Sequence, residues 1–94
     1  MTGASAEQPW RVVWLDDALR AARRLDRRTR ERIITAIERL AVTEYGDVAH
    51  LTSPQHGADY LLRVGTWRVL FNRETNTHTL IILHVVPRGR AYRD

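Results

Sequence analysis

The chain contains no cysteine and no lysine. Without cysteine it forms no disulfide and offers no thiolate to a metal, which fits a reducing compartment, and we predict a cytoplasmic location. It also lacks an apolar run long enough to span a bilayer and a charged-then-apolar leader, so we expect no association with a membrane. Its carboxylates are scattered along the sequence, and we therefore expect neither a metal nor another cofactor.

Arginine is what the chain has in excess. All 15 basic residues are arginine, against 11 acidic residues, and the formal net charge is +4. Such an excess favours an anionic partner, either a nucleic acid or an acidic protein segment. Codon usage in an arginine-rich genome also explains the absence of lysine, so the positions of the arginines carry more information than their number.

The length of 94 residues predicts one small domain. Residues 1–9 are mostly small and polar, and we predict a disordered N-terminal segment there. Residues 10–94 contain neither a repeat nor a linker, and we assign them to a single domain.

Two helices are expected between the first strand and the remaining strands. WRVVW at 10–14 predicts that first strand, and Asp16 or Asp17 is positioned to cap the helix that follows. Asp26 is the expected cap of a second helix over 27–42, where apolar residues recur at three- and four-residue spacing. Because only one or two residues separate the helices, we expect an antiparallel helix hairpin whose arginines form a solvated face.

A β-hairpin is the central prediction. Aromatic and β-branched residues predict strands over 59–65 and 67–73, joined by a tight turn at Gly65. LIILHVV within 78–86 predicts a last strand that is apolar on both faces and therefore lies inside the sheet. Residues 43–58 are predicted to be a loop, because glycines and a proline interrupt any period.

The predicted fold is a small single α+β domain with the order β-α-α-β-β-β. Its twisted antiparallel sheet of about four strands carries the helix hairpin on one face. The expected core comprises Ile33, Ile37, Leu40, Trp67, Val69, Phe71, Ile81 and Leu83, and which face of the last strand is turned to the core is left open.

Two arginines lie inside the otherwise apolar strands of the hairpin. Alternation places Arg68 on the face opposite to the core, and Arg63 lies on the neighbouring strand. A guanidinium within a strand is costly unless it reaches water or an anion. Arg88 follows the last strand and Tyr92 comes shortly after it, so these four groups are expected to converge. Clustered guanidinium groups repel one another, and phosphate is the anion that they match best.

Several of these residues also have a purely structural interpretation. Arg63 suits the surface of an edge strand, and Tyr92 suits packing against the sheet. Arg90 and Arg93 suit a solvated basic tail. A histidine such as His84, near the end of the last strand, is more often a half-buried packing residue than a catalyst, but its position keeps it a candidate.

Two motifs and the order of the elements resemble the RelE/ParE superfamily of toxins from type II toxin–antitoxin pairs, and the RelE-like branch is favoured. The motifs are YLLRVGTWRVLF at 60–71 and HVVPRGRAYR at 84–93, and the resemblance covers about residues 10–93. The sequence departs from nuclease members at Leu61, where they often have a basic residue, and at the Val-Pro pair of 86–87.

The resemblance implies a metal-independent, ribosome-dependent mRNA endonuclease that inhibits translation, with the RNA 2′-hydroxyl as nucleophile. It implies catalytic roles for Arg63, Arg68, Arg88 and Tyr92. We further expect RNA contacts from Arg63, Arg90, Arg93 and His84. Two other functions stay open: a ParE-like inhibitor of DNA gyrase, and an inactive homologue that acts as a co-repressor with its antitoxin.

The resemblance also implies partners. A cognate antitoxin protein, acidic and encoded next to this chain, is expected to hold it inactive. The ribosome and its mRNA are the expected targets, and operator DNA is expected to be contacted only through the antitoxin.

Overall fold

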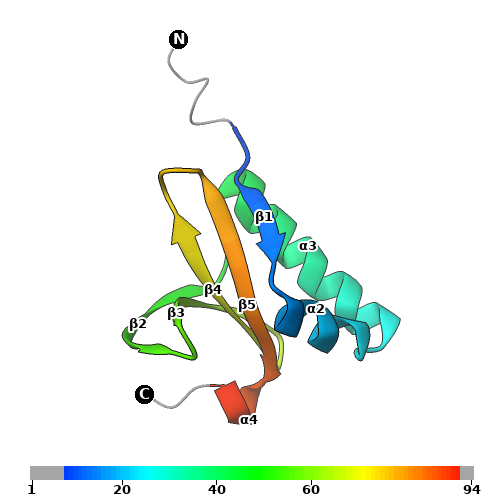
Figure 1. The fold of residues 1–94 in the computed structure, drawn as a ribbon. Helices are drawn as coiled ribbons and strands as arrows, with labels where there is room; N and C mark the ends of the chain where they lie inside the picture. Colours follow the sequence, from blue (N-terminus) through cyan, green and yellow to red (C-terminus); the bar gives the residue numbers. More distant parts are fainter. Residues whose placement is uncertain (1–7, 92–94) are drawn as a thin grey trace.

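Residues 8–91 are described by the computed structural model, with side chains as far as Gly89. Five strands form one sheet, and Figure 1 shows the two long helices together on one side of it. The elements are β1 (Arg11–Trp14), α2 (Asp16–Arg23), α3 (Arg27–Thr43), β2 (Val48–Gln55), β3 (Ala58–Val64), β4 (Trp67–Glu74), β5 (Thr79–Pro87) and the short α4 (Arg88–Ala91). No helix in this part of the chain has the length and apolar character needed to cross a membrane.

The sheet has the order β1-β5-β4-β3-β2. The predicted α+β class, with the helix hairpin on one face of the sheet, is confirmed. The prediction of a wholly antiparallel sheet of four strands is wrong in two details. Strand β1 runs parallel to β5, and β2 is a fifth strand. Strands β2 to β5 form an antiparallel meander whose last strand, β5, lies next to β1. The helix hairpin connects β1 to this meander across one face of the sheet, and β1 and β5 therefore run in the same direction.

Strand β2 lies in the segment that the sequence predicted to be a loop. It pairs antiparallel with β3, from Val48 opposite Leu62 to Gln55 opposite Ala58, with a register shift between these two ends. The strand lies at an edge of the sheet and is mostly exposed, so it lacks the apolar alternation of a half-buried strand. Pro54 is tolerated because an edge strand has one side without ladder partners.

The two helices begin in different ways. Helix α2 has Leu15 at its N-cap with no side-chain hydrogen bond, so the prediction that Asp16 or Asp17 caps it is wrong. Both carboxylates lie in the first turn instead, where they face the positive end of the helix dipole. Helix α3 is capped as predicted, because the Asp26 carboxylate accepts a hydrogen bond from the backbone N–H of Thr29 at 3.2 Å.

The main core lies between the helices and the sheet. Six of the eight predicted core residues contribute to it, with Trp67 half-buried at its margin and the others buried. The prediction for Ile81 and Leu83 is wrong, since both are half-buried and β5 buries Leu80, Ile82 and Val85 instead. A register shift between β4 and β5 at Leu70 breaks the alternation, which no count along β5 alone could reveal.

A second, smaller core lies on the other face of the sheet. It consists of Leu51, Ala58, Leu61 and Leu70, with Leu83 packed against it. Figure 1 shows the β2–β3 hairpin extending away from the helices. The far face of the sheet is therefore covered in part by the outer half of this hairpin.

The Asp26 cap predicts a pH dependence of stability. Hydrogen bonds from the side chain and the backbone of Thr29 hold the pKa of the Asp26 carboxyl below its ordinary value of 3.8. A lowered pKa in the folded state means that the stabilisation is present above the unfolded-state pKa and is lost as pH falls through the folded-state pKa. Asparagine is an equally good cap without the charge.

We therefore expect Asp26→Asn to melt slightly below the wild type at neutral pH, with the difference vanishing in acid. Asp26→Ala, which removes the cap itself, should melt lower by a few degrees at every pH. Thermal melts across an acidic pH series, followed by circular dichroism, measure both effects. A wild-type advantage over Asp26→Asn that persisted in strong acid would exclude the charge as its source.

Candidate functional site

Arg63 and Arg68 lie directly opposite each other on β3 and β4. They share the face of Leu61 and Leu70, which is the face away from the helices. Cross-strand partners have Cβ atoms about 4.5–5.5 Å apart, and two like charges in such a pair destabilise a sheet. The strands therefore place two arginines directly opposite each other, and their like charges favour an anion nearby.

Arg63 has an ion-pair partner within the protein. Its Nη1 lies 2.9 Å from a carboxylate oxygen of Asp47, and its backbone N–H donates to the Asp47 carbonyl at 2.9 Å. Both side chains reach solvent, at 36% and 65% exposure, and an exposed pair of this kind contributes little stability. An incoming anion can therefore replace Asp47 at small cost.

Arg68 is held differently. Its Nη1 donates to the carbonyl of Gly65 at 3.0 Å and to the carbonyl of Trp67 at 2.9 Å, so the guanidinium is fixed against the β3–β4 turn. Among residues 8–89 no carboxylate forms an ion pair with it. Its position is thus fixed by neutral oxygens, and its positive charge is left for a ligand.

Two further arginines reach the same turn. A Cβ placed on Gly65 would lie 2.9 Å from Nη2 of Arg32, so this α3 side chain rests against the turn from the helix side. The backbone N–H of Arg88 donates to the Thr66 carbonyl at 2.8 Å, which fixes the start of α4 beside the turn. Gly65 itself has φ +60°, which a glycine adopts without strain.

The turn is therefore contacted by the side chains of Arg32 and Arg68 and by the backbone of Arg88. Sequence reasoning placed Arg32 on a solvated helix face, and no signal in the sequence indicates that α3 passes this turn. Arg90 lies in α4, but its side chain lies beyond those that are described, and Tyr92 and Arg93 fall outside the described residues.

His84 faces the same side of the sheet as the arginine pair. Its partner on β4 is Leu70, two residues from Arg68. Its ring meets the ring of His56, from the β2–β3 turn, edge to face at 5.5 Å between centroids. His56 is a second residue that sequence reasoning missed, because only the folding of the hairpin across the sheet brings it to β5.

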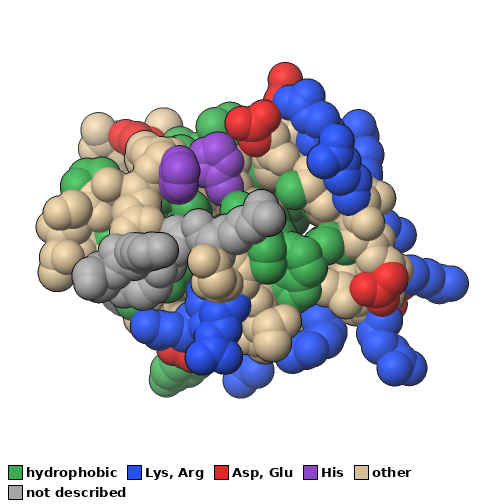
Figure 2. Space-filling model, turned by 90° about the horizontal axis from the view of Figure 1, so that it is seen from below, with side chains coloured by type: hydrophobic (Ala, Val, Ile, Leu, Met, Phe, Trp, Pro, Cys, Tyr) green, Lys and Arg blue, Asp and Glu red, His purple; other side chains and the backbone are tan. Residues whose placement is uncertain are grey.

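A groove of about 560 Å³ runs from the turn along the gap between α3 and β3. The arginines that line it are Arg28, Arg32, Arg39 and Arg63. Its two carboxylates, Glu31 and Asp47, each pair with an arginine, and buried Leu62 and Val64 add apolar surface. Figure 2 views the molecule from the α4 end, and the arginine side chains spread along the lower and right-hand rim. This groove suits a ligand that is both anionic and partly apolar.

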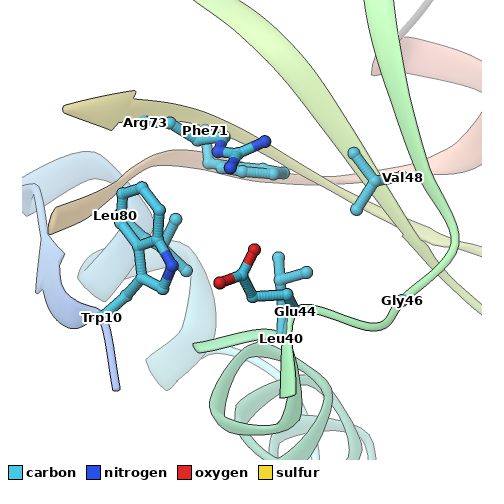
Figure 3. A pocket seen from close by; sticks show the side chains of 8 residues that line it. All are labelled: Trp10, Leu40, Glu44, Gly46, Val48, Phe71, Arg73 and Leu80. Atoms are coloured by element: carbon cyan, nitrogen blue, oxygen red, sulfur yellow. The ribbon is translucent and has the colours of Figure 1, made fainter. Parts of the chain in front are cut away.

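A smaller pocket of about 90 Å³ lies at the opposite end of the sheet. Figure 3 shows Trp10, Phe71 and Leu80 around it, with the Glu44 carboxylate pointing toward its interior. The Arg73 guanidinium lies 5.1 Å from the centre of the Trp10 ring. The pocket is too small for a nucleotide and far along the strands from Arg68, so it forms no part of the arginine site.

The described residues contain no group of three or more histidine, aspartate and glutamate side chains arranged to hold a metal ion. The chemistry available at the β3–β4 turn is that of fixed cations. Such groups bind phosphate oxygens and stabilise negative charge that develops on them.

Comparison with known proteins gives relatives of known structure, whereas no protein-family model and no curated protein matches the chain. A chain of the archaeal RelE–RelB complex from Pyrococcus horikoshii OT3 is 27% identical, with 88% of this chain and 99% of that chain covered and a TM-score of 0.70. A chain of the RelBE2 toxin–antitoxin complex from Mycobacterium tuberculosis is 24% identical, with 85% and 99% covered and a TM-score of 0.70.

A chain of the RelB–RelE antitoxin–toxin complex from Methanococcus jannaschii is 17% identical, with 82% and 91% covered and a TM-score of 0.65. This likeness and the one to the Mycobacterium tuberculosis chain, both under 25% identical, show the fold alone. The resemblance to RelE-like toxins that the motifs indicated is confirmed by these structures.

Proposed function

We propose that this chain, which has the fold of RelE-like toxins, is the toxin of a type II toxin–antitoxin pair and cleaves mRNA on the ribosome. The observation that carries the proposal is the β3–β4 turn, where backbone carbonyls hold the Arg68 guanidinium, the Arg32 guanidinium lies against Gly65 and the backbone N–H of Arg88 donates to Thr66. RNA supplies its own nucleophile, the 2′-hydroxyl, so the protein has only to position the phosphate, neutralise it and manage two protons.

In this proposal Arg68 neutralises the scissile phosphate. Its guanidinium is fixed by two carbonyl oxygens, so little reorganisation is needed when charge develops on the phosphate. Arg88 acts from the tail, and Arg63 exchanges Asp47 for the neighbouring backbone phosphate. Tyr92 orients or activates the attacking group, and no metal takes part.

The remaining predicted contacts belong to the same proposal. Arg90 and Arg93 would follow the RNA backbone from the tail, and His84 would contact the RNA from β5. The targets are the ribosome and its mRNA, in the cytoplasm.

The proposed partner is an acidic antitoxin encoded next to this chain. The α3–β3 groove offers it arginines on one wall and apolar surface beside them. Operator DNA would be contacted only through that antitoxin. Charge complementarity at such a surface contributes strongly to association rate and specificity.

Reversal of two groove charges tests this partner surface. With the product of the adjacent gene, the variant Arg28→Glu/Arg32→Glu should bind at least about tenfold more weakly than the wild type, because both charges face the expected acidic segment. Arg11→Glu, an exposed reversal on β1 outside the groove, is the matched control and should bind nearly as the wild type does. Titration calorimetry at two salt concentrations measures the affinities. Equal weakening by both variants would place the antitoxin elsewhere.

Inhibition of DNA gyrase is the second candidate, and one observation favours it. Leu61 is fully buried in the small core, so the position where nuclease members often carry a basic residue presents no charge to RNA. Induced expression separates the candidates. The nuclease proposal expects rapid loss of translation with cleaved transcripts, whereas gyrase inhibition expects DNA damage with intact translation. An inactive co-repressor would cause neither.

A further inference from the structure

Two histidines from distant parts of the chain meet on the arginine-bearing face of the sheet. The rings of His56 and His84 lie 5.5 Å apart between centroids, with an angle of 68° between their planes. His84 is half-buried on β5, and His56 is exposed in the β2–β3 turn. The sequence separation of these residues means that tertiary structure alone creates the contact.

The turn that carries His56 is firmly positioned. Its two central residues, His56 and Gly57, both have positive φ, at 51° and 84°, as a tight hairpin turn of this length requires. Asn72 on β4 donates to the Gly57 carbonyl at 2.9 Å and accepts from the backbone N–H of Asp59 at 2.7 Å. Both ends of one side-chain amide therefore tie the turn to the sheet.

Non-glycine residues are uncommon in a left-handed conformation, and histidine is among those found there more often. Asparagine would suit this turn better. The histidine is therefore placed at some conformational cost, and its ring is directed at His84.

The register shift in β5 directs His84 to this face. Ile82 and Val85 both belong to the main core, so the two residues between them, Leu83 and His84, both face the opposite side. His84 is opposite Leu70, while Arg68 is opposite Val86. Arg68 and His84 are thus diagonal neighbours on the same face of the sheet, with backbones about 7–8 Å apart. Bulges of this kind re-aim side chains beside active sites.

We propose that His84 accepts the proton of the attacking 2′-hydroxyl and that His56 is the residue that positions it. The inference rests on the proposed nuclease function. The 2′-oxygen forms a bond to phosphorus, its proton passes to the neutral imidazole of His84, and the bond from phosphorus to the 5′-oxygen breaks. The leaving 5′-oxygen takes a proton from water, and the imidazolium later returns its proton to solvent. The products are a 2′,3′-cyclic phosphate and a 5′-hydroxyl.

Imidazole suits this task because its ordinary titration range includes neutral pH. The charged residues on this face of the sheet are Arg68 on β4 and Arg63 and Asp59 on β3. Asp47 pairs with Arg63, and Arg88 follows β5. Ordinary guanidinium and carboxylate groups keep their charge between about pH 5 and 8, whereas an ordinary imidazole does not. Within that range, a rate that depends on an imidazole base is expected to vary with pH. A base must be neutral, so the cleavage rate should rise with pH to a plateau.

Single-turnover cleavage of mRNA on programmed ribosomes across this pH range tests the pair. His84→Gln should lower the plateau rate by on the order of a hundredfold, as loss of a general base does, and should abolish the rise with pH. His56→Asn keeps a residue suited to the turn, so it should fold normally, lose on the order of tenfold in rate and shift the midpoint of the profile. His50→Gln, an exposed histidine stacked on Tyr60 on the helix side of the sheet, is the matched control and should leave the profile unchanged.

The possible results separate the two proposals. If the wild type cleaves and His84→Gln keeps the wild-type rate or pH profile, the assignment of His84 is overturned while the nuclease stands. If His56→Asn keeps the midpoint of the wild type, His56 does not position the base. If the wild type cleaves no mRNA, the nuclease proposal fails and the role of His84 fails with it. Unchanged thermal midpoints and antitoxin affinity would exclude misfolding of the variants.

Discussion

Replacing Arg68 with alanine is expected to slow single-turnover cleavage on programmed ribosomes by on the order of a hundredfold or more, as loss of one transition-state donor does elsewhere. The guanidinium is fixed by the carbonyls of Gly65 and Trp67, and no carboxylate among the described side chains neutralises it. Its electrostatic contribution is therefore directed at the phosphate. Arg68→Lys keeps the charge but loses the planar fork, so it should recover only part of the rate.

The control for this prediction is Arg11→Ala, an exposed arginine on β1 that lies away from the turn. It should cleave at the wild-type rate. The effects of Arg68→Ala and Tyr92→Phe should also be less than additive, because residues that act together in one transition state are not additive when they are removed. If Arg68→Ala and Tyr92→Phe both cleaved at the wild-type rate, the active site would not be at this turn.

Replacing Phe71 with alanine is expected to have the largest effect on stability. Phe71 is 1% exposed, packs in the main core and stacks on Tyr60 at 5.5 Å between ring centroids. Truncation of a buried phenylalanine lowers the free energy of unfolding by about 3–5 kcal/mol. This is a large share of the roughly 5–15 kcal/mol by which a folded domain is stable. Urea denaturation should show a much lower midpoint with little change in slope.

Val48→Ala is the matched control. Val48 and Phe71 both line the small pocket beside Trp10, but Val48 is 36% exposed. Its free energy of unfolding should fall by less than about 1 kcal/mol, as for other exposed positions. Equal destabilisation by the two variants would contradict the assignment of Phe71 to the core.

Local patterns were sufficient to predict the helices and the central hairpin. The three- and four-residue spacing of apolar residues that places Ile33, Ile37 and Leu40 on one face of α3 is a property of the segment itself. The glycine turn at Gly65 is also a local property. The Asp26 cap was predictable for the same reason, since its hydrogen bond spans only three residues.

Features that depend on pairing between distant segments were not predictable. Strand β2 is an exposed edge strand whose register shifts along its length, so its sequence carries no regular alternation. The buried residues of β5 depend on a bulge that exists only in the pairing with β4. The parallel orientation of β1 follows from the topology of the whole chain.

The candidate site shows the same division. Arg63 and Arg68 were recognisable because charge inside an apolar hairpin is unusual. Arg32 and His56 were not, because α3 passes the β3–β4 turn and the β2–β3 turn reaches β5 only in the folded chain. The Asp47 partner of Arg63 lies in a segment predicted to be a loop, so the ion pair could not be predicted either.

The most direct test of the nuclease proposal uses two mRNAs that differ in one atom. Programmed ribosomes carry either an all-ribose message or one with a single 2′-deoxynucleotide at the scissile position, and the purified protein is added to each. The proposal predicts cleavage of the first message to a 2′,3′-cyclic phosphate and a 5′-hydroxyl, and no cleavage of the second at that position, because the nucleophile is missing. Equal cleavage of both messages, or cleavage of neither together with inhibition of DNA supercoiling by gyrase, would contradict it.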